Sequence, residues 1–158
     1  DLDVDDVEVV VHPQSIVHSM IRLTDGTLLA HIGETTMRHP IEYAITYPER
    51  ADHTDSSFDL AHVSLTFEPP DRAAFPCLDL AYEAARVGQC APAALNAANE
   101  VAVDAFLKGI LRWADISRVN QQTLDAHDGP ATPTLEDVLN IDRQARRSAA
   151  AIVAGLAL

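Results

Sequence analysis

Residues 11–32 read VHPQSIVHSMIRLTDGTLLAHI, and this stretch decides the first part of the fold. Two apolar-rich runs flank Thr24, Asp25 and Gly26, and Asp-Gly between such runs is a strong short-range signal for a β-hairpin. We therefore predict a hairpin over residues 16–32, with one histidine, His18, on its first strand. The second strand then carries His31.

The segment before the hairpin combines a β-branched run with a cluster of reactive side chains. Val7 to Val11 predicts a buried strand that stops at a turn because Pro13 follows it. His12, Ser15 and His18 would then gather at the end of a strand. We expect His12 to fix the turn that presents the other two.

After the hairpin, prolines divide the chain into short segments. Pro40 can occupy the first turn of a short helix that Pro48 ends, and residues 51–57 are a polar linker. His62 to Phe67 alternates enough to predict one more strand. Pro69-Pro70 then separates this part from a C-terminal half that is almost wholly helical in pattern.

Four helices are predicted in that half from proline and glycine punctuation. They cover residues 76–88, 91–108, 115–127 and a final segment from Thr134, which can cap its helix with Asp137 three residues on. Short connections between them predict a small four-helix bundle. The fold class is therefore α+β. We expect a first part with a strand, the hairpin and the short helix at residues 1–50, a linker with one short strand at 51–75, and the helical domain at 76–158.

Composition limits the partners and the compartment. The formal net charge of −13, with only 11 Lys and Arg among 158 residues, argues against nucleic acid and anionic membranes as partners. No apolar run approaches the roughly 20 residues of a membrane helix. Cys77 and Cys90 form neither a metal-type pair nor a disulfide framework, so we expect a soluble protein of the reducing cytoplasm.

The reactive cluster allows two interpretations for each residue. The imidazole of His18 suits proton transfer, but a histidine in a strand pair also serves as a plain hydrogen-bonding group. The hydroxyl of Ser15 could contact a substrate or bond the local backbone. No GxSxG-like context supports a serine nucleophile.

Other polar residues give weaker signals. His31, His39, His53 and His62 lack the compact spacing of a zinc site, so we expect surface or capping roles for them. Asn96, Asn99 and Glu100 share a predicted helix, where asparagine is unfavourable, and should bond something specific. We expect them to join the helical part to the linker or to the first part.

Several segments in order resemble one family. VHPQSIVHSM, LTDGTLLAHIGETTMRHPIEYAITYPER and APAALNAANEVAVDAFL closely resemble the C-terminal portion of the 1-deoxy-D-xylulose 5-phosphate reductoisomerase family, from about Val7 to the end. The resemblance implies an active-site role for His18 in substrate handling, substrate contact by Ser15, and a place for Met37 near the nicotinamide of NADPH. One departure concerns the loop, because Thr35 and Thr36 stand where many relatives have a proline and an acidic residue.

The same resemblance implies an enzyme larger than this chain. The family rearranges and reduces 1-deoxy-D-xylulose 5-phosphate, a sugar phosphate, to 2-C-methyl-D-erythritol 4-phosphate in non-mevalonate isoprenoid biosynthesis. It uses NADPH and Mg or Mn, and it works as a homodimer. The glycine-rich loop, the paired-carboxylate metal motif and the NKGLE segment do not occur here, and we identify no direct metal ligand.

Two hypotheses follow for the chain itself. In the first, it is a piece that needs an N-terminal NADPH-binding and metal-binding portion and is inactive alone; its start at Asp1 without a methionine fits this hypothesis. In the second, it is a free-standing, non-catalytic interaction module derived from the family. A free-standing module should protect the Val7–Val11 run and the apolar face of the hairpin, whereas a piece should expose both.

Overall fold

The computed structural model describes residues 3–52 and 59–157. These residues form two compact units, one of residues 9–70 and one of residues 3–8 with 71–157, and each is described by itself. Most of the predicted polar linker, including His53, lies outside the described residues.

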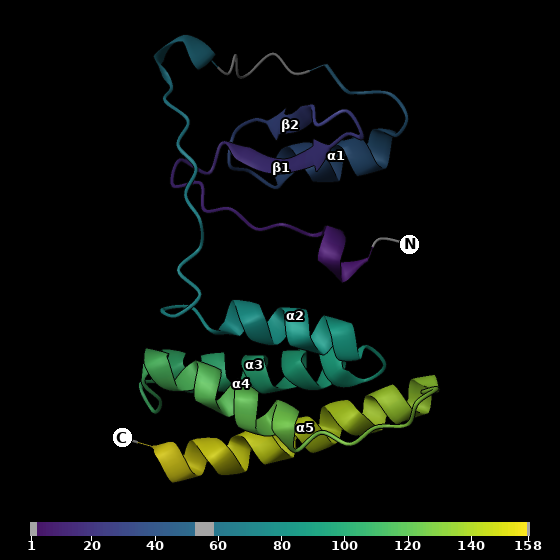
Figure 1. The fold of residues 1–158 in the computed structure, drawn as a ribbon, viewed down its shortest axis with the longest axis vertical. Coiled ribbons are helices and arrows are strands. Elements are labelled where there is room, and N and C mark those ends of the chain that lie inside the picture. Colours follow the sequence, from purple (N-terminus) through teal and green to yellow (C-terminus); the bar gives the residue numbers. More distant parts are fainter. Residues whose placement is uncertain (1–2, 53–58, 158) are drawn as a thin grey trace. The chain divides into compact units, whose positions relative to one another are not determined.

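The predicted hairpin is confirmed in the first unit. Strands β1 (Val17–Arg22) and β2 (Leu28–Ile32) pair antiparallel (Figure 1). In the turn, Gly26 has a φ of 86°, a left-handed conformation that glycine adopts without strain. The backbone N–H of Thr27 donates to the Asp25 carboxylate at 2.9 Å, and this bond lowers the pKa of Asp25 below its ordinary value.

A short helix follows the hairpin, as predicted. Helix α1 (Arg38–Thr46) carries Pro40 in its first turn, where a proline costs no helical hydrogen bond. The helix ends at Thr46, and the next peptide bond but one, Tyr47-Pro48, is cis.

Two predicted strands are wrong. Val7 to Val11 forms no strand, since only Val11 makes a bridge, to Glu68. His62 to Phe67 forms no strand either, because its start belongs to the 3₁₀ turn η2 (Leu60–His62). β-branched composition favours an extended backbone, but a strand needs a neighbour over several residues. Here Val11 pairs with Glu68 alone, and Glu68 lies just after the second segment.

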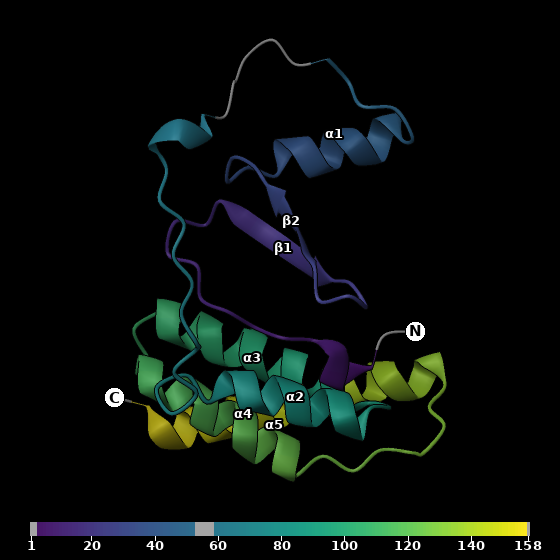
Figure 2. The ribbon, with the colours of Figure 1, turned by 45° about the horizontal axis from the view of Figure 1, so that its top comes forward.

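The second unit contains the four predicted C-terminal helices. Their bounds are α2 (Cys77–Val87), α3 (Ala91–Leu107), α4 (Ile116–Asp125) and α5 (Leu135–Leu156), with the 3₁₀ turn η3 (Trp113–Asp115) before α4. Gly88 and Gly109 follow α2 and α3 with positive φ. Figure 2 shows the four helices side by side. Their description as a regular bundle stays a prediction.

The buried core of the molecule belongs to these helices. Helix α3 packs against α2, α4 and α5, and its buried positions are alanines, which let the neighbouring helices approach closely. Helix α5 turns an apolar face to the core, with Ile141, Ala145 and Ala149 buried. Thr134 and Asp137 form the predicted capping box at its start, with the Asp137 backbone N–H donating to Thr134 Oγ1 at 3.2 Å.

The polar residues of α3 bond within the helical unit. Asn120 Nδ2 of α4 donates to Asn99 Oδ1 at 3.1 Å, and Arg146 Nη2 of α5 donates to Glu100 Oε2 at 2.7 Å. Asn96 Nδ2 donates to the other oxygen of Glu100. The expectation of specific partners is therefore correct, but these bonds join three helices to one another instead of reaching the linker.

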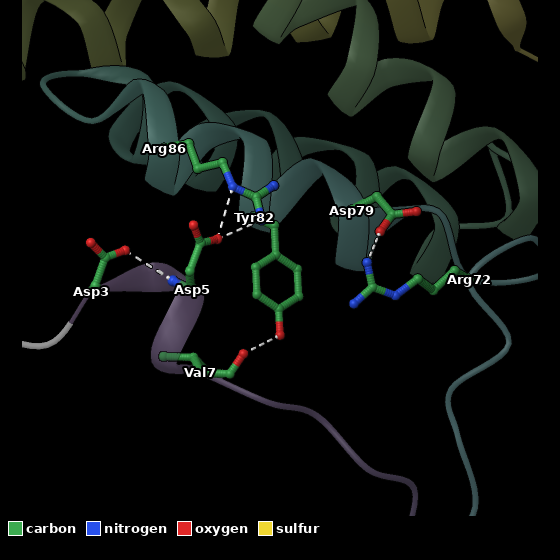
Figure 3. A network of polar contacts seen from close by, with 7 residues as sticks. All are labelled: Asp3, Asp5, Val7, Arg72, Asp79, Tyr82 and Arg86. Atoms are coloured by element: carbon green, nitrogen blue, oxygen red, sulfur yellow. Dashed lines mark hydrogen bonds and ion pairs between the residues drawn. The ribbon is translucent and has the colours of Figure 1, made fainter.

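An N-terminal 3₁₀ turn, η1 (Val4–Asp6), packs on α2 although it lies far from that helix in sequence. Tyr82 donates its hydroxyl to the Val7 carbonyl at 2.7 Å, and Arg86 Nη2 donates to Asp5 at 2.8 Å. Figure 3 shows the Tyr82 ring between this Arg86–Asp5 pair and the Arg72–Asp79 pair. These contacts join residues 3–8 to the helical unit.

The architecture is α+β, as predicted, with a two-stranded sheet and five α-helices among the described residues. Within the same residues, no helix has the length and apolar character needed to cross a membrane.

Candidate functional site

The turn before β1 is held by a second segment of the same unit. His12 Nδ1 lies 2.7 Å from the Thr66 carbonyl oxygen, and the His12 ring stacks on Phe67 at 4.6 Å between centroids. Gln14 Nε2 donates to Thr66 Oγ1 at 2.8 Å. His12 therefore fixes the turn, as expected from the sequence.

Ser15 lies in that turn with an unusual backbone. Its φ is 52°, in the left-handed region that a residue with a side chain rarely adopts. Its N–H donates to the His12 carbonyl at 3.0 Å, which closes the turn. The Ser15 side chain is exposed, so its hydroxyl is accessible to a ligand.

His18 occupies an irregular position in β1. Val17 pairs with Ile32 and Ser19 with His31, so the register slips at His18. Such bulges re-aim a side chain out of the regular alternation of a strand. The His18 side chain is exposed, and its ring lies 5.8 Å from the His31 ring.

The hydrogen bond of His18 determines which ring nitrogen is free. His18 Nε2 lies 3.2 Å from the Glu34 carbonyl oxygen. A carbonyl oxygen only accepts, so Nε2 must carry the proton of this bond. In the neutral ring, Nδ1 is then the nitrogen with the free lone pair, and it is the atom that can take a proton from a ligand.

The loop after β2 completes the arrangement. The Gly33 N–H donates to the Ile16 carbonyl at 3.1 Å, which continues the pairing of the hairpin. Thr35 Oγ1 donates to the Ser15 carbonyl at 2.7 Å. The loop therefore bonds both to the Ser15 turn and to His18, through different residues.

Met37 ends this loop. It precedes α1, and its side chain is 68% exposed. The Ser15 carbonyl is thus bonded to the Thr35 side chain and the His18 ring to the Glu34 carbonyl. The exposed Met37 follows two residues after Thr35. A flexible, polarizable thioether in this position suits contact with an aromatic ring of a cofactor.

Chemically, these groups can bind and exchange protons. An exposed hydroxyl, an imidazole with one committed and one free nitrogen, and a thioether on a neighbouring loop would serve a small polar substrate beside a planar ring. Among residues 3–52 and 59–157, no three His, Cys, Asp or Glu side chains come together as a metal site.

Sequence reasoning missed Glu34 and Thr35 as members of the site. Glu34 takes part through its backbone carbonyl, and Thr35 through a bond to a residue 20 positions earlier. A hairpin centred on Asp25-Gly26 pairs residues before 17 with residues after 32, so its register was the signal that could have found them.

Comparison with known proteins identifies the family. The model of the DXP reductoisomerase C-terminal domain matches residues 32–148. The chain is 49% identical over 153 residues to 1-deoxy-D-xylulose 5-phosphate reductoisomerase of Desulforamulus reducens, covering 96% of this chain and 40% of that relative. It is 52% identical over 152 residues to the same enzyme of Cupriavidus necator, covering 96% of this chain and 39% of the relative.

Solved structures agree with this assignment. The reductoisomerase of Zymomonas mobilis in complex with NADPH matches with a TM-score of 0.85 and 44% identity, over 92% of this chain and 39% of that protein. A DOX-P reductoisomerase in complex with NADPH, fosmidomycin and magnesium matches with a TM-score of 0.82 and 40% identity, over 91% of this chain and 38% of that protein.

The chain therefore spans about 40% of the length of the curated relatives it matches. The family model alone matches more than half of this chain, and the relatives extend the match over Ser15 and His18. On this evidence the chain belongs to the 1-deoxy-D-xylulose 5-phosphate reductoisomerase family and corresponds to its C-terminal portion.

Proposed function

We propose that this chain supplies one wall of the active site of a 1-deoxy-D-xylulose 5-phosphate reductoisomerase in the cytoplasm. The whole enzyme would form 2-C-methyl-D-erythritol 4-phosphate with NADPH and Mg or Mn. The observation that carries the proposal is the pair of bonds from Thr35 to Ser15 and from His18 to Glu34, which gather three functional segments in a chain of this family.

Each side chain has a role in this proposal. The free Nδ1 of His18 accepts or returns a proton at a substrate hydroxyl or carbonyl during the rearrangement. Ser15 binds the substrate through its exposed hydroxyl. Met37 packs against the nicotinamide ring of NADPH, which supplies the hydride of the reduction when bound. The metal ligands would come from residues outside this chain.

The domain organisation follows the same proposal. Residues 1–50 would complete a catalytic domain, residues 51–75 would act as a linker, and residues 76–158 would form a supporting helical domain. The N-terminal portion that binds NADPH and the metal would be a separate stretch of protein. The complete enzyme would be a homodimer.

Exposed apolar side chains favour the catalytic hypothesis over a free-standing module. Val9, Val10 and Val11 are 40%, 46% and 41% exposed, and Ile21 and Leu29 on the hairpin are 64% and 55% exposed. A module adapted to stand alone should cover such a surface. Their exposure supports the proposal that another part of the enzyme packs against these apolar side chains.

A fusion tests the proposal. This chain would replace the matching part of the Cupriavidus necator relative, to which it is 52% identical. We expect this fusion enzyme to oxidise NADPH when given 1-deoxy-D-xylulose 5-phosphate, and the isolated chain to show no turnover, because it lacks the other half of the site. NADPH absorbance and product analysis measure both.

Two results would count against it. Turnover by the isolated chain would contradict the claim that the site needs another portion. A fusion enzyme that folds and binds NADPH but never converts substrate would favour the non-catalytic interaction module.

A further inference from the structure

We infer that Thr35 is a positioning residue. It holds the loop of residues 34–37, which ends at Met37, against the turn of residues 12–15, which contains Ser15. The inference rests on the proposed function for its meaning in the enzyme. The contact between the loop and the turn is a property of this chain alone. Thr35 itself lies outside the groups proposed to touch substrate or cofactor, so its role is open to a clean test.

Residues 34–37 are held by local bonds and by bonds to the hairpin. Two of their bonds are local, because the Thr36 N–H donates to the Glu34 carbonyl and the Arg38 N–H donates to Thr36 Oγ1. Local bonds shape the loop but do not fix it to the hairpin. Among the described residues, the bonds that reach back to the turn and to β1 come from Thr35 and from His18 to Glu34.

The acceptor of the Thr35 bond is a carbonyl in a constrained turn. Thr35 Oγ1 donates at 2.7 Å to the carbonyl of Ser15, the residue with a φ of 52°. The left-handed backbone of Ser15 sets the direction of that carbonyl, since the orientation of a peptide plane follows from the adjoining dihedrals. The bond therefore ties the conformation that presents the Ser15 hydroxyl to the position of the loop.

The Thr35 bond also restricts the position of Met37. Only Thr36 separates Thr35 from Met37, and the Met37 carbonyl accepts the Ile41 N–H at the start of α1. Met37 is thus held between α1 on one side and the Thr35 bond on the other. Loss of the hydroxyl leaves the α1 side and the His18–Glu34 bond intact and removes one of the two bonds to the hairpin side.

The predicted effect is a change in local opening. A neutral hydrogen bond of this kind shifts a local equilibrium by roughly two- to tenfold. Thr35→Val keeps the shape of the side chain but removes the donor. We expect this change to raise, by that factor, the fraction of molecules in which residues 34–37 have moved away from the Ser15 turn. Thr35→Ser, which keeps the donor, should restore the original behaviour.

Methyl NMR of the 158-residue chain measures this directly, because it contains two methionines, Met20 on β1 and Met37 in the loop. In Thr35→Val we expect a lower order parameter for the Met37 methyl and an unchanged Met20 methyl, which also reports that the hairpin remains folded. Thr24→Val makes the same chemical change in the hairpin turn and should move neither signal.

Two NMR results would contradict the role of Thr35. An unchanged Met37 order parameter in Thr35→Val, or an equal loss in Thr35→Ser, overturns the inference. The NMR measurement contains no substrate or cofactor, so its outcome does not depend on the proposed function.

The fusion enzyme gives the matching kinetic readout. There, Thr35→Val should raise KM for NADPH by roughly two- to tenfold with kcat nearly unchanged, because the change acts on cofactor placement. A fall in kcat with KM unchanged contradicts that role. A fusion enzyme inactive even with Thr35 present counts against the proposed function and leaves the NMR result standing.

Discussion

His18 lies where the register of the hairpin slips, and its Nε2 is committed to the Glu34 carbonyl. Nδ1 is therefore the ring nitrogen available to a ligand. Proton transfer by Nδ1 can be tested separately from the hydrogen bond that Nε2 makes to the loop. A glutamine side chain can place an amide nitrogen near Nε2 and donate the same hydrogen bond, but it cannot transfer a proton at neutral pH.

This separation gives a residue-scale prediction. In the fusion enzyme, His18→Ala should lower turnover by about ten- to ten-thousandfold if the ring transfers a proton. His18→Gln should be as inactive as His18→Ala while keeping the loop in place. Steady-state kinetics and the Met37 methyl signal measure both effects. Activity restored by glutamine would mean that His18 only positions the loop.

The residues of the site were predictable to different degrees. Ser15 and His18 attracted attention because reactive side chains gathered around one proline. Thr35 drew attention only as a departure from the family pattern, since its function depends on a carbonyl 20 positions away. Sequence spacing indicates side-chain chemistry well, but it does not indicate which backbone carbonyl a turn will present.

At the scale of elements, an ion pair between Arg146 and Glu100 joins helix α5 to α3. Arg146 donates to Glu100 on α3 and to Asp142 on its own helix. The hydrogen bonds from Arg146 and Asn96 lower the pKa of Glu100 below its ordinary value of 4.5. Folding therefore favours the charged form of Glu100.

The sign of this shift predicts a pH dependence. A carboxyl whose pKa is lower in the folded state contributes stability above its ordinary pKa and loses that contribution as pH falls through the lowered value. Glu100→Gln should therefore lower the Tm slightly at neutral pH, and the difference should shrink as the pH falls below 4.5. Thermal unfolding followed by circular dichroism measures it. A difference independent of pH would contradict an ionic origin.

Helices were more predictable than strands in this chain. The start and end of α2 to α5 follow local signals such as Pro76, Gly88, Gly109 and the Thr134 cap. The Val7–Val11 run has strand composition, but pairing depends on a distant partner, and Glu68 supplies it at one position. Local chemistry determines helix ends, whereas strand formation depends on what lies alongside.

At the scale of the whole molecule, burial is uneven. Among the described residues, all the buried ones lie between Leu80 and Val153. Between residues 9 and 52, and between 59 and 70, none is buried. Since burial of apolar area is the main favourable contribution to folding, the unit with the hairpin has little intrinsic stability.

Hydrogen exchange should report this difference. In the isolated chain, we expect amides of β1 and β2 to exchange at least about a hundredfold faster than those of α3, because opening of a weakly packed unit costs far less than global unfolding. In the fusion enzyme the strand amides should gain protection. Equal protection of both regions in the isolated chain would show that the hairpin unit is stable without a partner.

The attachment of η1 to α2 has a consequence for chain continuity. Residues 3–8 and residues 71–157 form one unit, so residues 9–70 are an excursion that leaves the helices and returns to them. A single cut by a protease within that excursion would separate the chain into two peptides without releasing either. The shorter N-terminal peptide would keep its Tyr82–Val7 and Arg86–Asp5 contacts with the helical unit. We therefore expect the two peptides to elute together under native conditions and to separate in denaturant.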